Sequence, residues 1–196
     1  MTSLSLWWPL ADHEDVRVAL EAAYADGSRG YHDTVHLCEV FDRLVELAPT
    51  TAFDREPVLL AAWFHDAVYD GQPGAEERSA QWAATALADH PGVEEVVRLV
   101  LLTEHHRPAD DDVNGGALSD ADLAILAAPP ERYAAYVASV RAEYAHVSDA
   151  DFASGRSAIL ADLLTKPALF HTAHAREHWE APARANVERE LSELRR

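Results

Sequence analysis

The sequence predicts an all-α fold, a single-domain bundle of helices. Apolar residues recur at helical spacing along almost the whole chain, and we find no convincing alternation of apolar and polar residues that would indicate a strand. The length of 196 residues suits one domain with a sizeable core, which we predict over 1–196. A content of 48% apolar and 26% charged residues is ordinary for a soluble globular protein.

Charge and cysteine content limit the classes of partner and site. There are 16 lysine and arginine residues against 34 acidic residues, and this charge of −18 argues against duplex nucleic acid or an anionic membrane surface as a partner. The negative charge does not exclude a small anionic substrate, because a bound divalent cation reverses the local field. The single cysteine, Cys38, excludes an intrachain disulfide and suits a cytoplasmic location. No apolar run approaches the ~18–20 residues that cross a bilayer, and residues 1–10 do not resemble a signal peptide.

The helices predicted in the first half are separated by glycine and proline breaks. Glycines at 27 and 30 end the first helix, and Pro49 follows the second. A turn at 71–74 separates the third helix from the fourth, and Pro91 suits the first turn of the fifth. In order, these helices are one capped by Asp12, one that begins near Asp33, and those over about Arg55–Tyr69, Ala75–Asp89 and Val93–His105.

The second half begins with an acidic, glycine-containing loop predicted over Pro108–Gly116. The last helices carry Phe170, Trp179 and several tyrosines at helical spacings, which indicates core packing or a homodimer contact. The predicted helices are a short one over about Asp120–Ala127, one after Pro130 that includes Tyr133 and Val140, one from Asp151 to near Lys166, and one over about His174–Leu194.

The most informative stretch is Trp63–Asp70, which follows the apolar run Pro57–Ala62. A helix that is apolar all round is normally buried. An ionised carboxylate is costly to bury, so Asp66 requires a compensating cation or dense hydrogen bonding. His65 offers a neutral imidazole nitrogen, and the two residues together are natural metal ligands. A buried Asp–His hydrogen bond or a helix-end cap explains the dipeptide as well.

Three further stretches bring histidine and aspartate into predicted helices. His32 and His36 are four residues apart and share one helix face, His106 ends the fifth helix, and Asp120 and Asp122 enter an apolar helix. The ordinary alternatives are an exposed pair for His32 and His36, a solvated helix end for His105 and His106, and an N-cap for Asp120.

Taken together, these stretches resemble the HD superfamily of metal-dependent phosphohydrolases, in which the ligands follow the order His…His-Asp…Asp in an all-helical bundle. More narrowly, the chain looks like the small bacterial single-domain predicted phosphohydrolases of that superfamily. The resemblance implies a bundle of the HD type, with a metal-binding core over about 29–127 and C-terminal helices over about 131–196 packed on it. The matching stretches are His32–Val40 (HDTVHLCEV), Ala61–Asp66 (AAWFHD) and Asp120–Leu123 (DADL).

The resemblance implies His36, His65, Asp66 and Asp122 as metal ligands, because the family pattern favours the second histidine of the first stretch and the second aspartate of the third. Two imidazoles and two carboxylates suit a divalent Mn, Fe, Co, Ni, Zn or Mg ion. Such an ion lowers the pKa of a bound water and offsets charge that develops on a phosphate. The expected activity is therefore hydrolysis of a small phosphorylated substrate, such as a nucleotide.

Other residues near these motifs are candidates for substrate binding or acid–base work. Arg29 is a candidate phosphate clamp, because a guanidinium grips two phosphate oxygens, and a surface salt bridge is its alternative. His32 is expected to orient or protonate the leaving group. Glu76, Glu77 and Asp70 are further candidates for catalysis or substrate binding, although charged helix starts are common.

The presence of His106, with or without His105, bears on the choice between hydrolysis and two alternative functions. Superfamily members with extra histidines between the His-Asp pair and the final Asp hold two metals, and some are diiron oxygenases. A non-catalytic metal-binding helical domain is a third reading. His171, His174 and His178 also recur at helical spacing, but a polar helix face is the preferred interpretation there, because no carboxylate motif accompanies them.

Overall fold

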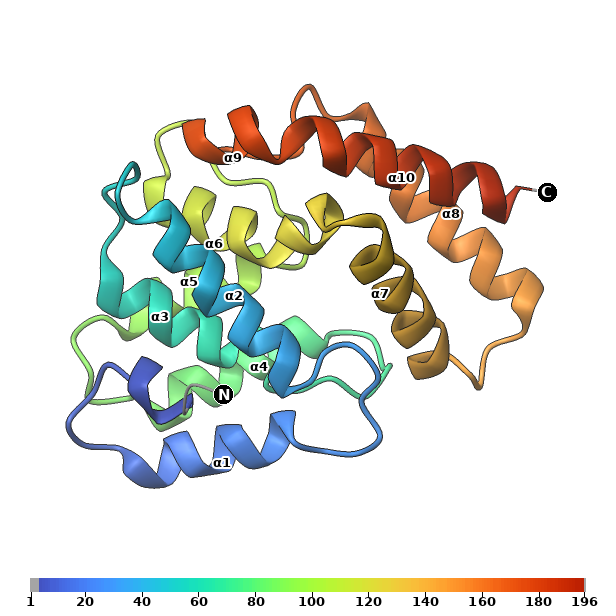
Figure 1. The fold of residues 1–196 in the computed structure, drawn as a ribbon. Coiled ribbons are helices and arrows are strands. Elements are labelled where there is room, and N and C mark those ends of the chain that lie inside the picture. The colour runs from blue at the N-terminus through green and yellow to red at the C-terminus, as the bar shows by residue number, and fades with distance from the viewer. Residues whose placement is uncertain (1–3, 196) are drawn as a thin grey trace.

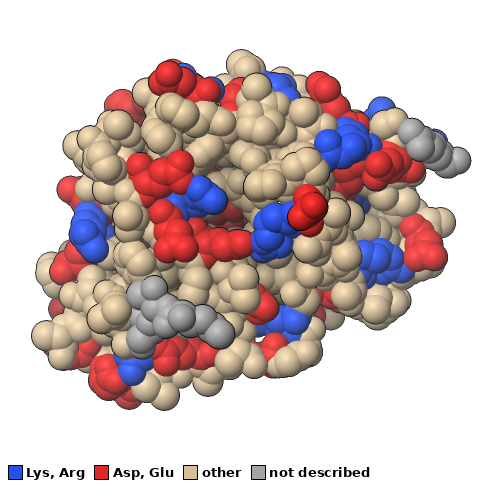
Figure 2. Space-filling model, in the orientation of Figure 1, with Lys and Arg blue, Asp and Glu red and all other residues tan. Residues whose placement is uncertain are grey.

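The computed structural model describes residues 4–195, and none of these residues lies in a strand, so the predicted all-α fold is confirmed (Figure 1). No helix in this part of the chain is long and apolar enough to span a membrane. Acidic and basic side chains are interspersed on the face shown in Figure 2. The helices are η1 (Leu4–Trp7), α1 (Glu14–Tyr24), α2 (Thr34–Leu47), α3 (Arg55–Phe64), α4 (Ala75–Ala86), α5 (Val93–Leu102), α6 (Val113–Leu123), η2 (Ala124–Ala127), α7 (Pro130–Glu143), α8 (Asp149–Thr165), α9 (Ala173–His178) and α10 (Glu180–Leu194).

Helix α3 forms the centre of the core. Residues 58–64 of this helix are all buried, as expected for a helix that is apolar on every side. Helices α2, α4, α5 and α6 pack against it, and the rings of Phe41 and Trp63 lie 5.5 Å apart between centroids. This packing places the end of α3, and with it His65, inside the bundle.

Helix α3 is shorter than the sequence predicts. It ends at Phe64 and not at Tyr69, and the amide of Val68 donates to the hydroxyl of Ser79 (3.0 Å) instead of to a helical carbonyl. The His-Asp pair therefore lies in the turn that follows the helix. In this turn the two side chains are freed from the helical spacing, and they point to the same region.

Helix α5 also ends early, at Leu102 and not at His105. The hydroxyl of Thr103 donates to the carbonyl of Val100 (2.7 Å), a local bond that competes with helix continuation. His106 then adopts a left-handed backbone conformation with φ of 48°. The two histidines after α5 consequently lie in a turn, so their side chains need not share one face.

Helix α6 begins inside the stretch predicted as a loop. The Asp112 side chain accepts from the amide of Gly115 (2.9 Å) and so caps a helix that starts at Val113. The predicted boundary near Asp120 was wrong, because an acidic run followed by two glycines resembles a loop, although here the run ends in the N-cap and the glycines lie in the first turns of a buried helix.

Asp120 is not the N-cap that the sequence predicts, because it lies inside α6 with no exposed surface. Its carboxylate accepts from the amides of His171 (2.8 Å) and Thr172 (2.7 Å), which lead into α9. Burial raises the pKa of Asp120 to about 6, although these hydrogen bonds oppose the shift. Asp120 therefore anchors a distant segment of the chain to α6.

The predicted terminal helix is divided at Trp179 into α9 and α10. Helix α10 packs on η2 and α8, and the Asn186 amide group donates to the carbonyls of Leu126 (2.8 Å) and Ala128 (2.9 Å). These bonds hold the C-terminal helices against the segment that follows α6. In Figure 1, α7 and α8 are two arms joined by a short connection, with α10 running along α8.

We predict that Asp120→Ala lowers the free energy of unfolding by about 2–3 kcal/mol, because it leaves two buried amides without an acceptor. Urea unfolding followed by circular dichroism measures the change. Asp111→Ala is the matched control, since Asp111 is exposed, and it should change the free energy by less than about 0.5 kcal/mol. Equal stabilities of the two variants would contradict the anchoring role.

Candidate metal centre

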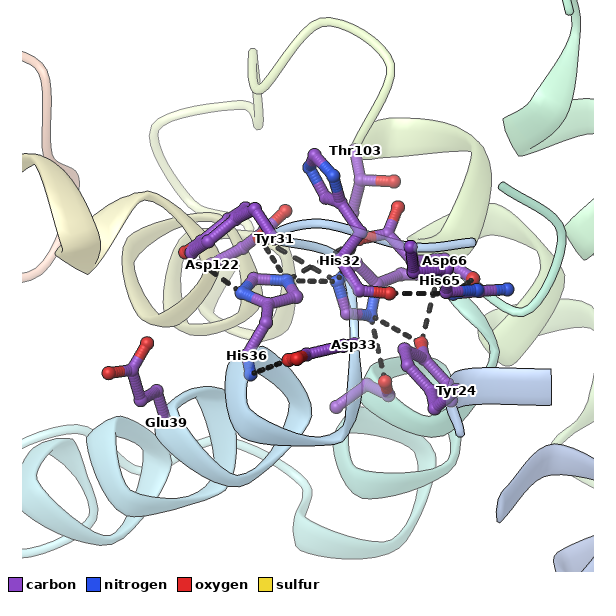
Figure 3. Close-up of polar contacts among 12 residues, drawn as sticks. Tyr24, Tyr31, His32, Asp33, His36, Glu39, His65, Asp66, Thr103 and Asp122 are labelled. Carbon is purple, nitrogen blue, oxygen red and sulfur yellow. Dashed lines mark hydrogen bonds and ion pairs between the residues drawn. The ribbon is translucent and has the colours of Figure 1, made fainter. Parts of the chain in front are cut away.

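Four side chains from three parts of the chain converge beside the end of α3 (Figure 3). His36 comes from the first turn of α2, His65 and Asp66 follow α3, and Asp122 lies near the end of α6. His36 Nε2 lies 3.1 Å from His65 Nε2, 3.4 Å from Asp66 Oδ2 and 3.3 Å from Asp122 Oδ1. His65 Nε2 lies 3.1 Å from Asp66 Oδ2 and 3.6 Å from Asp122 Oδ1.

Each imidazole is oriented by a hydrogen bond at its other nitrogen. His65 Nδ1 donates to the carbonyl of Ala62 (2.8 Å), and His36 Nδ1 pairs with the hydroxyl of Tyr31 (3.0 Å). Both Nε2 atoms consequently face the cluster. Because His65 Nδ1 carries its proton, His65 Nε2 presents a lone pair, and at 3.1 Å from His36 Nε2 it requires either a proton on that atom or a cation between the two rings.

The charges of the cluster favour a cation at this position. Burial by itself lowers the pKa of His36, but the carboxylates of Asp122 and Asp66 outweigh it and raise that pKa. Burial by itself raises the pKa of Asp66, but the neighbouring imidazoles, His65 foremost, hold it well below its usual range. The pKa of Asp122 is lowered in the same way. The site therefore keeps two carboxylates ionised in a buried position.

The donor set fits a divalent metal ion. Ligands at about 2.1 Å from one ion lie about 3.0–3.4 Å from each other in octahedral or tetrahedral geometry. The contacts of His36 and His65 with each other and with the carboxylates span 3.1–3.6 Å. His36, His65 and Asp66 form a group whose donor atoms all lie within 4.8 Å of one another, and Asp122 borders it through both imidazoles. This nitrogen and oxygen set suits several first-row metals and Mg.

Local hydrogen bonds position the ligands. Asp33 caps α2 by accepting from the amides of Val35 (2.8 Å) and His36 (3.2 Å), which places His36 in the first turn. The Tyr24 hydroxyl accepts from the amide of Asp66 (3.2 Å). Both ligands therefore sit on segments that are fixed at their backbones.

Arg29 ties the two ligand segments together. Its Nη1 donates to the carbonyls of His32 and Asp66 (2.8 Å each), and its Nη2 donates to the carbonyl of Ala67 (2.9 Å). The predicted phosphate clamp is corrected on this point, because both terminal nitrogens of the guanidinium are engaged by the backbone. Arg29 is a positioning residue that aligns the turn carrying the His-Asp pair.

The two histidines after α5 have different surroundings. His106 Nε2 lies 3.5 Å from Asp122 Oδ2, and its buried Nδ1 has no hydrogen-bond partner within residues 4–195. Burial lowers the pKa of His106 to about 4. The His105 side chain is 71% exposed and lies near Glu104. Of the two predicted candidates for a second metal or for substrate, only His106 borders the cluster.

Three predicted acidic candidates lie apart from the cluster. Asp70 is exposed and forms a two-pronged ion pair with Arg78 (2.6 and 2.8 Å). Glu76 and Glu77 lie in the first turn of α4, and no hydrogen bond or ion pair within residues 4–195 links them to the four converging side chains. The structure therefore gives Asp70 a surface role and gives the two glutamates no contact with the site.

His32 is held beside the cluster by a residue from α7. Its Nδ1 lies 2.8 Å from Glu143 Oε2, and Glu143 Oε1 accepts from the amides of Gly30, Tyr31 and His32 (3.0, 2.8 and 2.9 Å). Its ring stacks on Tyr69 with centroids 3.8 Å apart. These contacts place the proton on Nδ1 and leave Nε2 available.

A cleft of about 750 Å³ opens beside the cluster. His36 and Asp122 border a separate crevice of about 60 Å³, so the wide approach to the cluster passes His32 and His106. The cleft lining includes His32 and His106 near the cluster and the cations Arg107, Arg156 and Lys166.

Sequence reasoning missed four residues that shape this site. Tyr31 and Tyr24 contact the imidazoles, Glu143 holds His32, and Arg156 lines the cleft. Tyr31 lies next to a motif histidine, which was an available signal. Glu143 and Arg156 lie more than a hundred residues from His32, and nothing in their local sequence indicates where their side chains lead.

The region of the chain that contains this centre is similar to a known protein family. The model of the HD domain family matches residues 34–149, which is more than half of the chain. The matched range includes His36, His65, Asp66 and Asp122. Comparison with curated proteins and with solved structures gave no match.

We predict that His36→Ala loses the bound metal while His32→Ala keeps it, because only His36 directs a nitrogen at the other three side chains. Elemental analysis of gently purified protein measures metal per chain. The two variants are matched controls for each other, since both remove an imidazole from the same segment. Loss of metal from His32→Ala alone would show that the other histidine is the ligand.

Proposed function

This chain belongs to the HD domain family, and we propose that it is a metal-dependent phosphohydrolase acting on a small phosphorylated substrate such as a nucleotide. HD domains are generally metal-dependent phosphohydrolases, which supports hydrolysis as the reaction class. The observation that carries the proposal is the cluster of two buried imidazoles and two carboxylates that are 14% exposed, beside a wide cleft. We propose His36, His65, Asp66 and Asp122 as the metal ligands.

A divalent ion held by His36, His65, Asp66 and Asp122 would supply an acidified water as nucleophile and positive charge for the phosphoryl oxygens. The chain itself supplies the orientation of the ligands. Arg29 and Tyr24 fix the turn that carries Asp66, the Ala62 carbonyl holds the proton of His65 on Nδ1, and the Tyr31 hydroxyl orients the ring of His36. These contacts leave the donor atoms little freedom to rearrange during turnover.

Arg156 replaces Arg29 as our candidate for binding the phosphoryl group. Its Nε donates to Glu190 (2.8 Å) and its Nη2 to the Tyr136 hydroxyl (2.9 Å). Nη1 has no hydrogen-bond partner among the described residues, and the side chain lines the cleft next to His32. A guanidinium fixed on one edge can donate from its free edge at little entropic cost.

His32 is our candidate for the general acid. Glu143 holds a proton on Nδ1, so the Nε2 edge of the protonated ring can give a proton to the departing oxygen. The stack on Tyr69 keeps the ring in this orientation. The pair acts from the cleft side, opposite the positions used by the metal ligands.

One observation favours a second candidate function. His106 Nε2 lies 3.5 Å from Asp122 Oδ2, so His106 and Asp122 supply two donors for a second ion. A diiron oxygenase of this family would use such a site. Two irons per chain with oxygen-dependent turnover would favour the oxygenase over the phosphohydrolase.

We predict that Asp66→Ala abolishes hydrolysis of a panel of phosphorylated metabolites supplied with the native metal, because a ligand is lost. Released inorganic phosphate is the readout. Asp89→Ala, at an exposed position after α4, should retain full activity. Unchanged turnover and metal content in Asp66→Ala would remove the basis of the proposal.

We predict that His32→Ala lowers kcat about 100-fold or more on an alkyl phosphate such as ethyl phosphate, whose leaving group needs a proton. On p-nitrophenyl phosphate the loss should be less than about tenfold, because p-nitrophenolate departs without one. His146→Ala, which removes an exposed imidazole, is the control. The same loss on both substrates would argue against the acid role.

A further inference from the structure

A second hollow continues from the wide cleft and lies between α7 and α8. It has a volume of about 370 Å³, and it shares His32, Tyr136, Arg156 and Ile159 with the wider cleft. The two hollows are therefore neighbouring lobes of one surface depression. Of the residues that the two hollows share, His32 contacts the cluster, with its ring centroid 5.6 Å from that of His36.

The lining of this second lobe is aromatic. Tyr69, Tyr136, Tyr144 and Phe152 contribute rings, and Val140 adds an apolar wall. Of its charged side chains, Arg156 is 11% exposed and paired with Glu190, and Asp151 is exposed. An apolar wall with few polar groups is typical of a small-molecule site.

Helix α8 is little covered along this lobe. Only Leu160 is buried, although α8 has 17 residues. Phe152, Arg156 and Ile159 are spaced four and three residues apart, so they share one helix face, and Ile159 is 57% exposed. A Cβ added at Gly155, on the same lining, would meet no atom within 4 Å. The helix therefore leaves Ile159 and the space above Gly155 open on the cleft side, while Phe152 packs against the core.

We propose that this lobe, defined by Tyr69, Tyr144, Phe152 and Gly155, is the subsite for a flat, uncharged aromatic group of the substrate. The inference rests on the phosphohydrolase function proposed above and names the part of the substrate that this chain selects. A cavity of roughly 150 Å³ already accepts benzene, so this lobe has room for one or two fused rings. Ring faces attract each other in offset or edge-on geometry, and tyrosine and phenylalanine supply such faces.

The position of the lobe determines how the proposed substrate would be oriented. The phosphoryl group would lie by His32 and Arg156, where the two lobes meet, and the ring would lie between α7 and α8. His32 stands at this junction with its ring stacked on Tyr69. An alkyl phosphate would fill only the first lobe and would gain nothing from the aromatic walls.

Binding of two non-hydrolysable probes tests the subsite. Calorimetry of the metal-containing full chain should give phenylphosphonate an affinity about tenfold or more above that of ethylphosphonate, because the phenyl ring buries more apolar surface. Phe152→Ala removes one wall of the lobe. Gly155→Leu fills the lobe and also improves helix propensity. Both variants should reduce the ratio of the affinity for phenylphosphonate to that for ethylphosphonate to below about threefold. Ser154→Leu, exposed on the same helix and outside both lobes, should retain it.

Equal affinities for the two probes, absence of binding by either, or an unchanged ratio in Gly155→Leu would overturn the subsite. Release of phosphate from ethyl phosphate reports on the proposed function separately, because that substrate carries no ring. Hydrolysis without a phenyl preference would reject the subsite alone, whereas a phenyl preference without any hydrolysis would reject the phosphohydrolase function alone.

Discussion

The structure depends on two ionised carboxylates that are largely withdrawn from water beside two buried imidazoles in an apolar bundle. Such charges are costly to remove from water, and a cluster in which imidazole nitrogens lie 3.1–3.6 Å from carboxylate oxygens is stable only when positive charge accompanies the carboxylates. The surrounding contacts serve this cluster. The apolar packing of α3 carries His65 and Asp66 inward, the Asp33 cap places His36, and Arg29 joins the two segments.

The sequence predicts the helical fold well because apolar spacing and breaks at glycine and proline report on local structure. The ordered motif also names four side chains that the structure brings together, and their role as ligands stays a prediction. Helix ends were predicted less well, because side-chain hydrogen bonds decide where a helix ends. Examples are the bond from the Val68 amide to the Ser79 hydroxyl and the bond from the Thr103 hydroxyl to the Val100 carbonyl. Asp120 shows the same limit: its amide partners lie 51 and 52 residues away.

The N-terminal and C-terminal helices contribute different parts of the site. The cluster comes from α2, α6 and the turn after α3, whereas Glu143 and Arg156 come from α7 and α8. Glu143 links the halves, since its carboxylate receives three backbone amides and holds His32. The proposed metal ligands therefore come from the N-terminal helices, whereas α7 and α8 supply side chains that hold His32 and line the cleft.

The central claim is that four side chains remote in sequence bind one cation. Anomalous diffraction from crystals of metal-containing protein tests it most directly, because the method locates the ion without reference to activity. The account predicts a peak about 2.1 Å from Nε2 of His36 and of His65 and from a carboxylate oxygen of Asp66 and of Asp122. Metal-containing protein whose only peak lies elsewhere, for example beside the stacked pair His174 and His178, would contradict it.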